Sequence, residues 1–147
     1  MATKHLYKHL LLATDLSEHS HFVAKRAAQM AEASGAKLSV VHVLGHTPMA
    51  YAGEFSIPID VQFELELKKQ AEKQLEKLCK KYNIPKKSQY ITLGSVKLAV
   101  TDLAKKIKAD LLIVGTHSHT GLDILLGSQA NAIVHAATCD TLVIRIK

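Results

Sequence analysis

Five short apolar runs alternate with amphipathic segments along the chain, and this alternation restricts the fold more than any other feature. The runs are residues 9–14, 37–44, 88–93, 110–115 and 141–146. They are continuous and rich in leucine, valine and isoleucine, which is typical of strands that are buried on both faces. Strands that alternate with helices form a parallel sheet covered by helices on both sides. The sequence therefore predicts an α/β fold with three layers.

Helical spacing of apolar residues marks the segments between these runs. Ser17 is placed to cap a first helix, which we expect to end at Gly35. A second helix has its apolar residues at helical spacing, namely Leu67, Ala71, Leu75, Leu78 and Tyr82. Ser95 opens a third helix that continues to Ile107, and a fourth is expected over roughly 128–138. Residues 45–60, which hold two glycines and two prolines, are predicted to form a loop.

Length and composition favour one domain that spans residues 1–147. The chain is 48% apolar, which suits a globular protein with a sizeable core. Its N-terminal apolar stretch is too short for a signal peptide, and none of its runs approaches the roughly 20 residues of a membrane span. We therefore expect a cytoplasmic protein that does not enter a membrane. Cys79 and Cys139 form no CxxC pair, which argues against a structural zinc site or a disulfide framework.

The net charge of +6 raises the question of nucleic-acid binding. The lysines occur in pairs that are interleaved with glutamates or apolar residues, as on solvated helix faces. Aromatic residues make up only 5% of the chain, and no aromatic RNA-binding motif is present. A nucleic-acid partner is therefore not expected.

A parallel sheet of this type binds ligands beyond the carboxyl ends of its strands, where the strand order reverses. That rule brings three segments of this chain together. They are Ala13-Thr14-Asp15, Val41-His42-Val43 and the segment that begins at Gly115. The sequence therefore predicts a ligand site built from these segments.

The segment GTHSHTGLDILLGSQANAIV, residues 115–134, has glycines at regular intervals and ends in a predicted helix. It contains neither a GxxxxGK[ST] motif nor a GxGxxG motif. Gly127 precedes the helix start, where the backbone N–H groups of Ser128, Gln129 and Ala130 have no helical partner and favour a phosphate. Gly115 lets a sugar or base lie against the backbone. The same residues also fit a helix cap and ordinary turns, and both interpretations stay open.

The last predicted strand has the pattern of an edge strand. Arg145 interrupts the apolar pattern of residues 141–146, which is typical of a strand at the edge of a sheet. An apolar edge strand is suited to pairing with a second copy of itself. We therefore expect a homodimer through this strand.

Three stretches of the chain resemble the universal stress protein family, in its UspA-like form. They are HLLLATDLSEHS, AKLSVVHV and DLLIVGTHS followed by GLDILLGSQANAIVHAATCDTLVIR, and the resemblance spans essentially the whole chain. It implies a Rossmann-like domain with strand order 3-2-1-4-5, a dimer through the last strand and a role in bacterial stress response. Many members bind ATP or AMP, whereas others, including the A-type proteins, bind no nucleotide.

The family's nucleotide binders share the pattern Gly, two residues, Gly, nine residues and then Gly-Ser or Gly-Thr. Gly115 and the pair Gly127-Ser128 match this pattern, Ser118 replaces the second glycine, and the gap 119–126 is one residue short. The resemblance also implies that Asp15 contacts the adenosine and that the backbone of 41–43 contacts the adenine edge. A nucleotide-binding protein is therefore expected. A non-binding A-type protein that acts through unknown protein partners is the alternative, and a slow ATPase is a second one.

Nine histidines invite a metal site, for example from His42, His117 and His119. These residues lack the spacing of known metal motifs, so we expect the loop histidines His117 and His119 to face solvent or phosphate and expect no protein-bound metal. With ATP, Mg²⁺ would be held by the phosphates. Ser128 lacks the G-x-S-x-G context of a nucleophile, and no catalytic residue is predicted. The remaining histidines near the N-terminus are expected at the surface, namely His5, His9, His19 and His21.

Overall fold

The computed structural model describes residues 6–44, 61–117 and 128–146. Within these ranges the strands are β1 (His9–Ala13), β2 (Lys37–Leu44), β3 (Gln89–Leu93), β4 (Leu111–His117) and β5 (Asp140–Ile146). The α-helices are α1 (Ser20–Ser34), α2 (Val61–Lys81), α3 (Val96–Ile107) and α4 (Ser128–Ala136). A 3-10 helix, η2 (Lys86–Ser88), precedes β3. All paired strands are parallel, and their order β3-β2-β1-β4-β5 confirms the predicted fold.

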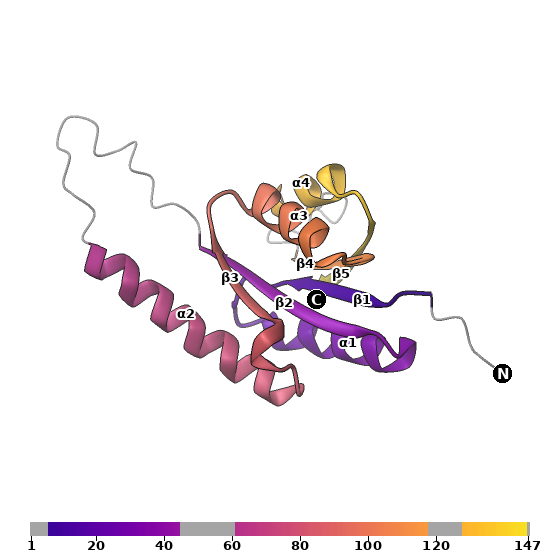
Figure 1. The fold of residues 1–147 in the computed structure, drawn as a ribbon, viewed down its shortest axis with the longest axis horizontal. Coiled ribbons are helices and arrows are strands. Elements are labelled where there is room, and N and C mark those ends of the chain that lie inside the picture. Colours follow the sequence, from indigo (N-terminus) through magenta and orange to yellow (C-terminus); the bar gives the residue numbers. More distant parts are fainter. Residues whose placement is uncertain (1–5, 45–60, 118–127, 147) are drawn as a thin grey trace.

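In the part of the chain that the structure describes, helices cover both faces of the sheet (Figure 1). α1 and α2 pack on one face, where their alanine, leucine and valine side chains join one buried cluster. α3 and α4 pack on the other face and join a second cluster. The three layers follow from the continuous apolar character of the strands, because both faces of the sheet must be removed from water.

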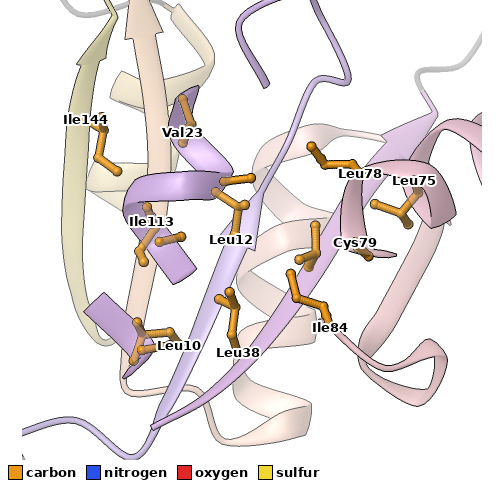
Figure 2. Close-up of a cluster of buried hydrophobic side chains, with 14 of the residues drawn as sticks. Leu10, Leu12, Val23, Leu38, Leu75, Leu78, Cys79, Ile84, Ile113 and Ile144 are labelled. Carbon is orange, nitrogen blue, oxygen red and sulfur yellow. The ribbon is translucent and has the colours of Figure 1, made fainter. Parts of the chain in front are cut away.

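Successive residues of β1 show how the sheet supplies both clusters. Leu10 and Leu12 point toward α1 and α2, whereas Leu11 points toward α3 and α4, and none of the three is exposed to solvent. Figure 2 shows Leu10 and Leu12 among the side chains of the first cluster. Burying a leucine side chain stabilises a fold by about 1.5–3 kcal/mol. The central strand is therefore held from both sides.

The strand order reverses beside β1. Ala13, the last residue of β1, lies opposite Val41 on β2 and Val114 on β4. From β1 the chain first adds β2 and β3 on one side, and then adds β4 and β5 on the other. The connections that leave β1 and β4 therefore diverge, which opens a crevice at the carboxyl ends of these strands.

The predicted start of the first helix was wrong. The helix begins at Ser20, its N-cap is His19, and His19 makes no capping hydrogen bond with its side chain. The hydroxyl oxygen of Ser17 instead accepts from the backbone N–H of His19 at 3.3 Å. Ser17 is thus used in the turn before the helix. The predicted stop is confirmed, because Gly35 caps the helix with φ of 65°.

The predicted apolar face of the second helix is only partly buried. Ala71, Leu75 and Leu78 are buried, whereas Leu67 is 38% exposed and residues 63–70 all face solvent. The reason is visible in Figure 1, where the first turns of α2 extend beyond the sheet. The predicted loop 45–60 lies outside the described residues. Among the described helices, none is long and apolar enough to cross a membrane.

β4 is longer than predicted. It continues to His117 because its pairing with β5 continues to the pair His117 and Ile146. Gly115 therefore lies inside the strand and not at its end. β5 lies at the edge of the sheet, as its Arg145 suggested.

Candidate functional site

A pocket with a volume of about 350 Å³ lies at the carboxyl ends of the central strands. Its size falls within the roughly 300–1,000 Å³ range of small-molecule sites. Nine residues singled out in the sequence line it together, namely Ala13, Thr14, Asp15, Val41, His42, Val43, Gly115, Gln129 and Ala130. The topology thus brings residues from three distant parts of the chain to one pocket.

Four predicted site residues are described in part or not at all. Ser118 and Gly127 lie outside the described residues. His117 is the last residue of β4 and Ser128 is the first residue of α4, so only the course of their backbone is known. Gln129 and Ala130 line the pocket from the first turn of α4, so the N-terminus of this helix is adjacent to the pocket.

The loop between β1 and α1 forms one wall of the pocket and is fixed by its own polar groups. The Thr14 hydroxyl accepts from the backbone N–H of Leu16 at 3.1 Å. A carboxylate oxygen of Asp15, Oδ1, accepts from the backbone N–H of Ser17 at 2.9 Å. Leu16 has a left-handed backbone with φ of 56°, which these bonds stabilise. The loop therefore holds Thr14 and Asp15 in one arrangement at the pocket.

His42 connects β2 to this loop. Its ring atom Nδ1 lies 2.8 Å from the backbone oxygen of Thr14. Because a carbonyl oxygen can only accept, Nδ1 must carry the hydrogen of this bond. The backbone N–H of Thr14 also donates to the Val41 oxygen at 2.9 Å. Thr14 is thus bonded to β2 through both of its backbone polar groups.

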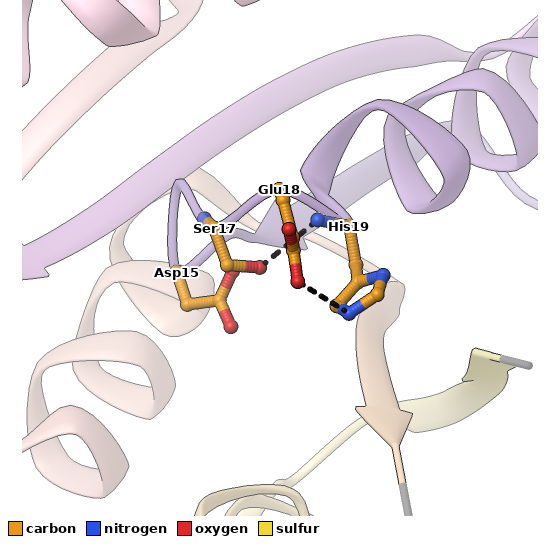
Figure 3. A network of polar contacts seen from close by, with 4 residues as sticks. All are labelled: Asp15, Ser17, Glu18 and His19. Carbon is orange, nitrogen blue, oxygen red and sulfur yellow. Dashed lines mark hydrogen bonds and ion pairs between the residues drawn. The ribbon is translucent and has the colours of Figure 1, made fainter.

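The start of α1 contributes residues that the sequence analysis did not assign to the site. His19, Ser20 and Val23 line the pocket, and the His19 side chain, which was expected at the surface, is 36% exposed. His19 Nε2 lies 3.4 Å from a carboxylate oxygen of Glu18, and Figure 3 shows both side chains beside Asp15 and Ser17. The sequence could have placed the first residues of α1 at the pocket, because a helix that follows a central strand starts at the crevice.

Most of the remaining lining is apolar. It comes from the helices and strands around the crevice, namely Val96, Val100, Val114, Ile133 and Ile146, with Thr116 as the polar exception. The sequence analysis expected Val114 and Ile146 to be buried in strands and assigned none of these residues to the site. An apolar lining with a few polar groups suits the flat ring of a base, which is buried between hydrophobic side chains.

Gly115 has a packing role of its own. A Cβ atom at this position would lie 2.7 Å from Cγ2 of Val23 and 3.1 Å from Cδ1 of Ile146. The missing side chain therefore lets α1 lie close against β4. This explanation requires no ligand, and it stands beside the predicted contact with a sugar or base.

Two polar side chains with shifted pKa values, His9 and Asp110, lie at the opposite end of the sheet from the pocket. His9 is half-buried, and its Nδ1 and Nε2 atoms lie 3.1 Å from the Ile107 oxygen and 2.7 Å from the Ser39 hydroxyl. Desolvation lowers the pKa of His9. The prediction that His9 is a surface residue was therefore wrong, because its ring joins β1 to β2 and α3.

Asp110 anchors the same end. Its two carboxylate oxygens accept from the backbone N–H groups of Lys8 and His9 at 2.9 and 3.0 Å. Desolvation pushes the pKa of Asp110 upward, but these backbone bonds outweigh it and leave the pKa below its ordinary value. These groups organise the sheet end far from the pocket.

Neither cysteine has the character of a reactive thiol. Cys79 is fully buried, and desolvation raises its pKa to about 12. Desolvation also raises the pKa of Cys139. In the part of the chain that the structure describes, no three His, Cys, Asp or Glu side chains are grouped for a metal ion. The side chains of His117 and His119 are outside that part.

The chain is similar to one known protein family over nearly its whole length. The model of the universal stress protein family matches residues 6–145. The relative "Universal stress protein A homolog 1" of Coxiella burnetii is 51% identical over 141 residues, which cover 96% of this chain and 98% of the relative.

Solved structures agree with the fold. A crystal structure of a universal stress protein in complex with cAMP is 25% identical, with a TM-score of 0.64, over 95% of this chain and 97% of that one. The structure of the protein MJ0577 has a TM-score of 0.77 at 21% identity and covers 97% of this chain and 98% of its own. The pocket described above therefore lies in a known type of sheet, and the chain belongs to the universal stress protein family.

Proposed function

We propose that this protein binds an adenine nucleotide, ATP or AMP, in the pocket at the carboxyl ends of β1, β2 and β4. The observation that carries the proposal is that nine predicted residues from three distant segments line this one pocket. The neighbouring structure in complex with cAMP, itself an adenine nucleotide, supports the same ligand class.

The base is proposed to lie against β2. Backbone polar groups alternate between the two sides of a strand, and the Val41 oxygen faces β1 because it accepts from Thr14. The Val43 N–H and C=O groups therefore face the same side, beyond the last pair of β1 and β2. An N–H and a C=O on one residue are complementary to the N1 acceptor and the N6 donor of adenine.

The sugar and phosphates are proposed to lie between Asp15 and α4. A carboxylate is a strong acceptor for ribose hydroxyls, and the Asp15 side chain is held at the pocket by its bond to Ser17. The first turn of α4 supplies backbone N–H groups and the positive end of a helix dipole to the phosphates. The same part of the proposed site includes His117, Ser118, Gly127 and Ser128. With ATP, Mg²⁺ would be held by the phosphates.

The protein is proposed to act as a binding module and not as an enzyme. No nucleophile with an adjacent base is evident among the described residues of the pocket. We further propose that it works in the cytoplasm as a homodimer through residues 141–146, because β5 is an edge strand. Sedimentation equilibrium should then give twice the chain mass.

A calorimetric titration with ATP and Mg²⁺ tests the binding site. Asp15→Asn keeps an oxygen that can accept from Ser17 but removes the charge that receives the ribose hydroxyls. We expect it to weaken binding roughly tenfold, as for the loss of one charge-assisted hydrogen bond. Asp102→Asn is the matched control, because Asp102 is exposed on α3 and does not line the pocket. Equal affinities of wild type and Asp15→Asn would show that the Asp15 carboxylate does not contact the ligand.

The second candidate is a non-binding A-type protein that acts through protein partners. Ser118 and the shortened segment 119–126 favour it, since both depart from the pattern of nucleotide binders. Folded protein that gives no saturable heat with either ATP or AMP would favour this candidate.

A further inference from the structure

The His42 side chain takes the place of a strand-pairing hydrogen bond at the edge of the pocket. The register of β1 and β2 ends with Ala13 opposite Val41, and the Thr14 N–H still donates to the Val41 oxygen. The next bond of a continued parallel ladder would join the Val43 N–H to the Thr14 oxygen. In the structure this oxygen accepts instead from Nδ1 of the His42 ring, at 2.8 Å.

The use of a side-chain hydrogen bond in place of a backbone one has two consequences for the pocket. The Thr14 carbonyl is satisfied without the Val43 backbone, whose N–H faces the side that β1 has left. The chain can also turn away from the sheet directly after Thr14, into the loop that carries Asp15. Leu16 then adopts its left-handed backbone, and Thr14 and Asp15 accept from the N–H groups of Leu16 and Ser17.

The chemistry of the ring fixes its role in this arrangement. Because Nδ1 donates to a carbonyl, the neutral ring carries its hydrogen on Nδ1 and has its lone pair on Nε2. His42 is half-buried and lines the pocket, so its ring is held by β2 on one side and by the loop on the other.

We propose that His42 is a positioning residue for the ligand site: its Nδ1–H group fixes the loop that carries Asp15 and leaves the Val43 backbone available to the base. This role rests on the proposed nucleotide binding for its effect on affinity, but the arrangement of the loop is a property of the free protein. The two can therefore be tested separately.

Two substitutions separate the donor from the rest of the ring. His42→Asn retains an N–H donor near the position of Nδ1, whereas His42→Leu retains the bulk of the side chain but has no donor. We expect His42→Leu to weaken the binding of ATP with Mg²⁺ about tenfold, as for one lost hydrogen bond. His42→Asn should restore binding to within about threefold of wild type. His135→Leu is the control, because His135 is exposed on α4 and does not line the pocket.

Nitrogen-15 spectra of the free protein provide the readout that is independent of nucleotide. We expect the His42 ring to show the Nδ1–H tautomer, and we expect the Leu16 and Ser17 amides to exchange faster in His42→Leu but not in His42→Asn. An Nε2–H tautomer, or unchanged exchange in His42→Leu, would overturn the proposal. If wild type shows the tautomer and protected amides but binds no nucleotide, the proposed function fails while the positioning of the loop stands. If wild type binds and His42→Leu binds equally well, the positioning role fails alone.

Discussion

Gly115 lies where α1 packs directly on β4, and its hydrogen atom occupies space that a methyl group cannot. A Cβ atom would lie 2.7 Å from Cγ2 of Val23. We predict that Gly115→Ala lowers the free energy of unfolding by roughly 1–3 kcal/mol, as overpacking does in other cores. Urea denaturation measures this cost. Adding Val23→Ala removes the contacted methyl groups, so the double variant should be less destabilised than the sum of the two single variants. Simple additivity would contradict the packing role.

His9 makes stability depend on pH. Desolvation lowers its pKa in the folded state, and Lys37 lowers it further, while the Ile107 oxygen and Asp110 oppose this shift. The unfolded chain therefore binds more protons than the fold below the ordinary histidine pKa of 6.5. We predict that the free energy of unfolding falls as the pH is lowered through 6.5 toward the folded pKa.

His9→Asn isolates this effect, since asparagine can donate to the Ile107 oxygen but does not titrate. Urea denaturation at pH 7.5 and pH 5.5 should show a smaller loss in His9→Asn than in wild type. The other histidines are present in both proteins and cancel in this difference. A loss of equal size in the two proteins would show that His9 is not the group responsible. Asp110 acts in the same direction at lower pH, because its pKa is also lowered.

Single residues also show where sequence-based prediction ends. Asp15 and His42 could be assigned to the pocket because the topology determines which strand ends meet there. The role of Ser17 could not be predicted, because its hydroxyl is equally suited to a helix cap and to the turn before the helix. A polar histidine at the start of a strand is expected at the surface. Only the fold places His9 against Ser39 and Ile107.

Two helices end in the same backbone conformation with different residues. Gly35 ends α1 with φ of 65°, and Lys108 ends α3 with φ of 59°. A left-handed backbone costs a residue with a Cβ roughly 1 kcal/mol relative to glycine. We predict that Gly35→Ala destabilises the fold by about 1 kcal/mol and that Lys108→Gly stabilises it by about 0.5–1 kcal/mol. Thermal and urea denaturation measure both. Opposite signs at the two sites support the account, whereas a destabilising Lys108→Gly would contradict it.

The helices and strands themselves were predictable from apolar periodicity, but their environment was not. The stripe of α2 continues from Leu75 and Ala71 back to Leu67 and Phe63, and nothing in the sequence marks where it leaves the sheet. Phe63 and Leu67 are nevertheless 51% and 38% exposed. The length of β4 was underestimated for a related reason. Its last residues are strand only because β5 pairs with them.

At the scale of the whole molecule, the alternation of strands and helices predicted the sheet, its parallel strands and the place of the crevice. The family resemblance supplied the order 3-2-1-4-5, which the structure confirms. From the first turns of α1 and α3 the pocket also takes Ser20 and Val96, which the sequence analysis did not assign to it. Which side of a helix reaches the crevice depends on how the helix packs, and a one-dimensional pattern does not contain that information.

The most direct test of nucleotide binding at this pocket follows the backbone amide signals while AMP, and then ATP with Mg²⁺, is added to the ¹⁵N-labelled protein. We predict saturable shifts at Val43, Gly115 and Gln129, which lie in three segments and line one pocket. The amides of His9 and Asp110, at the other end of the sheet, should remain unchanged. Spectra that do not change, or changes confined to that other end, would contradict nucleotide binding at the carboxyl ends of the strands.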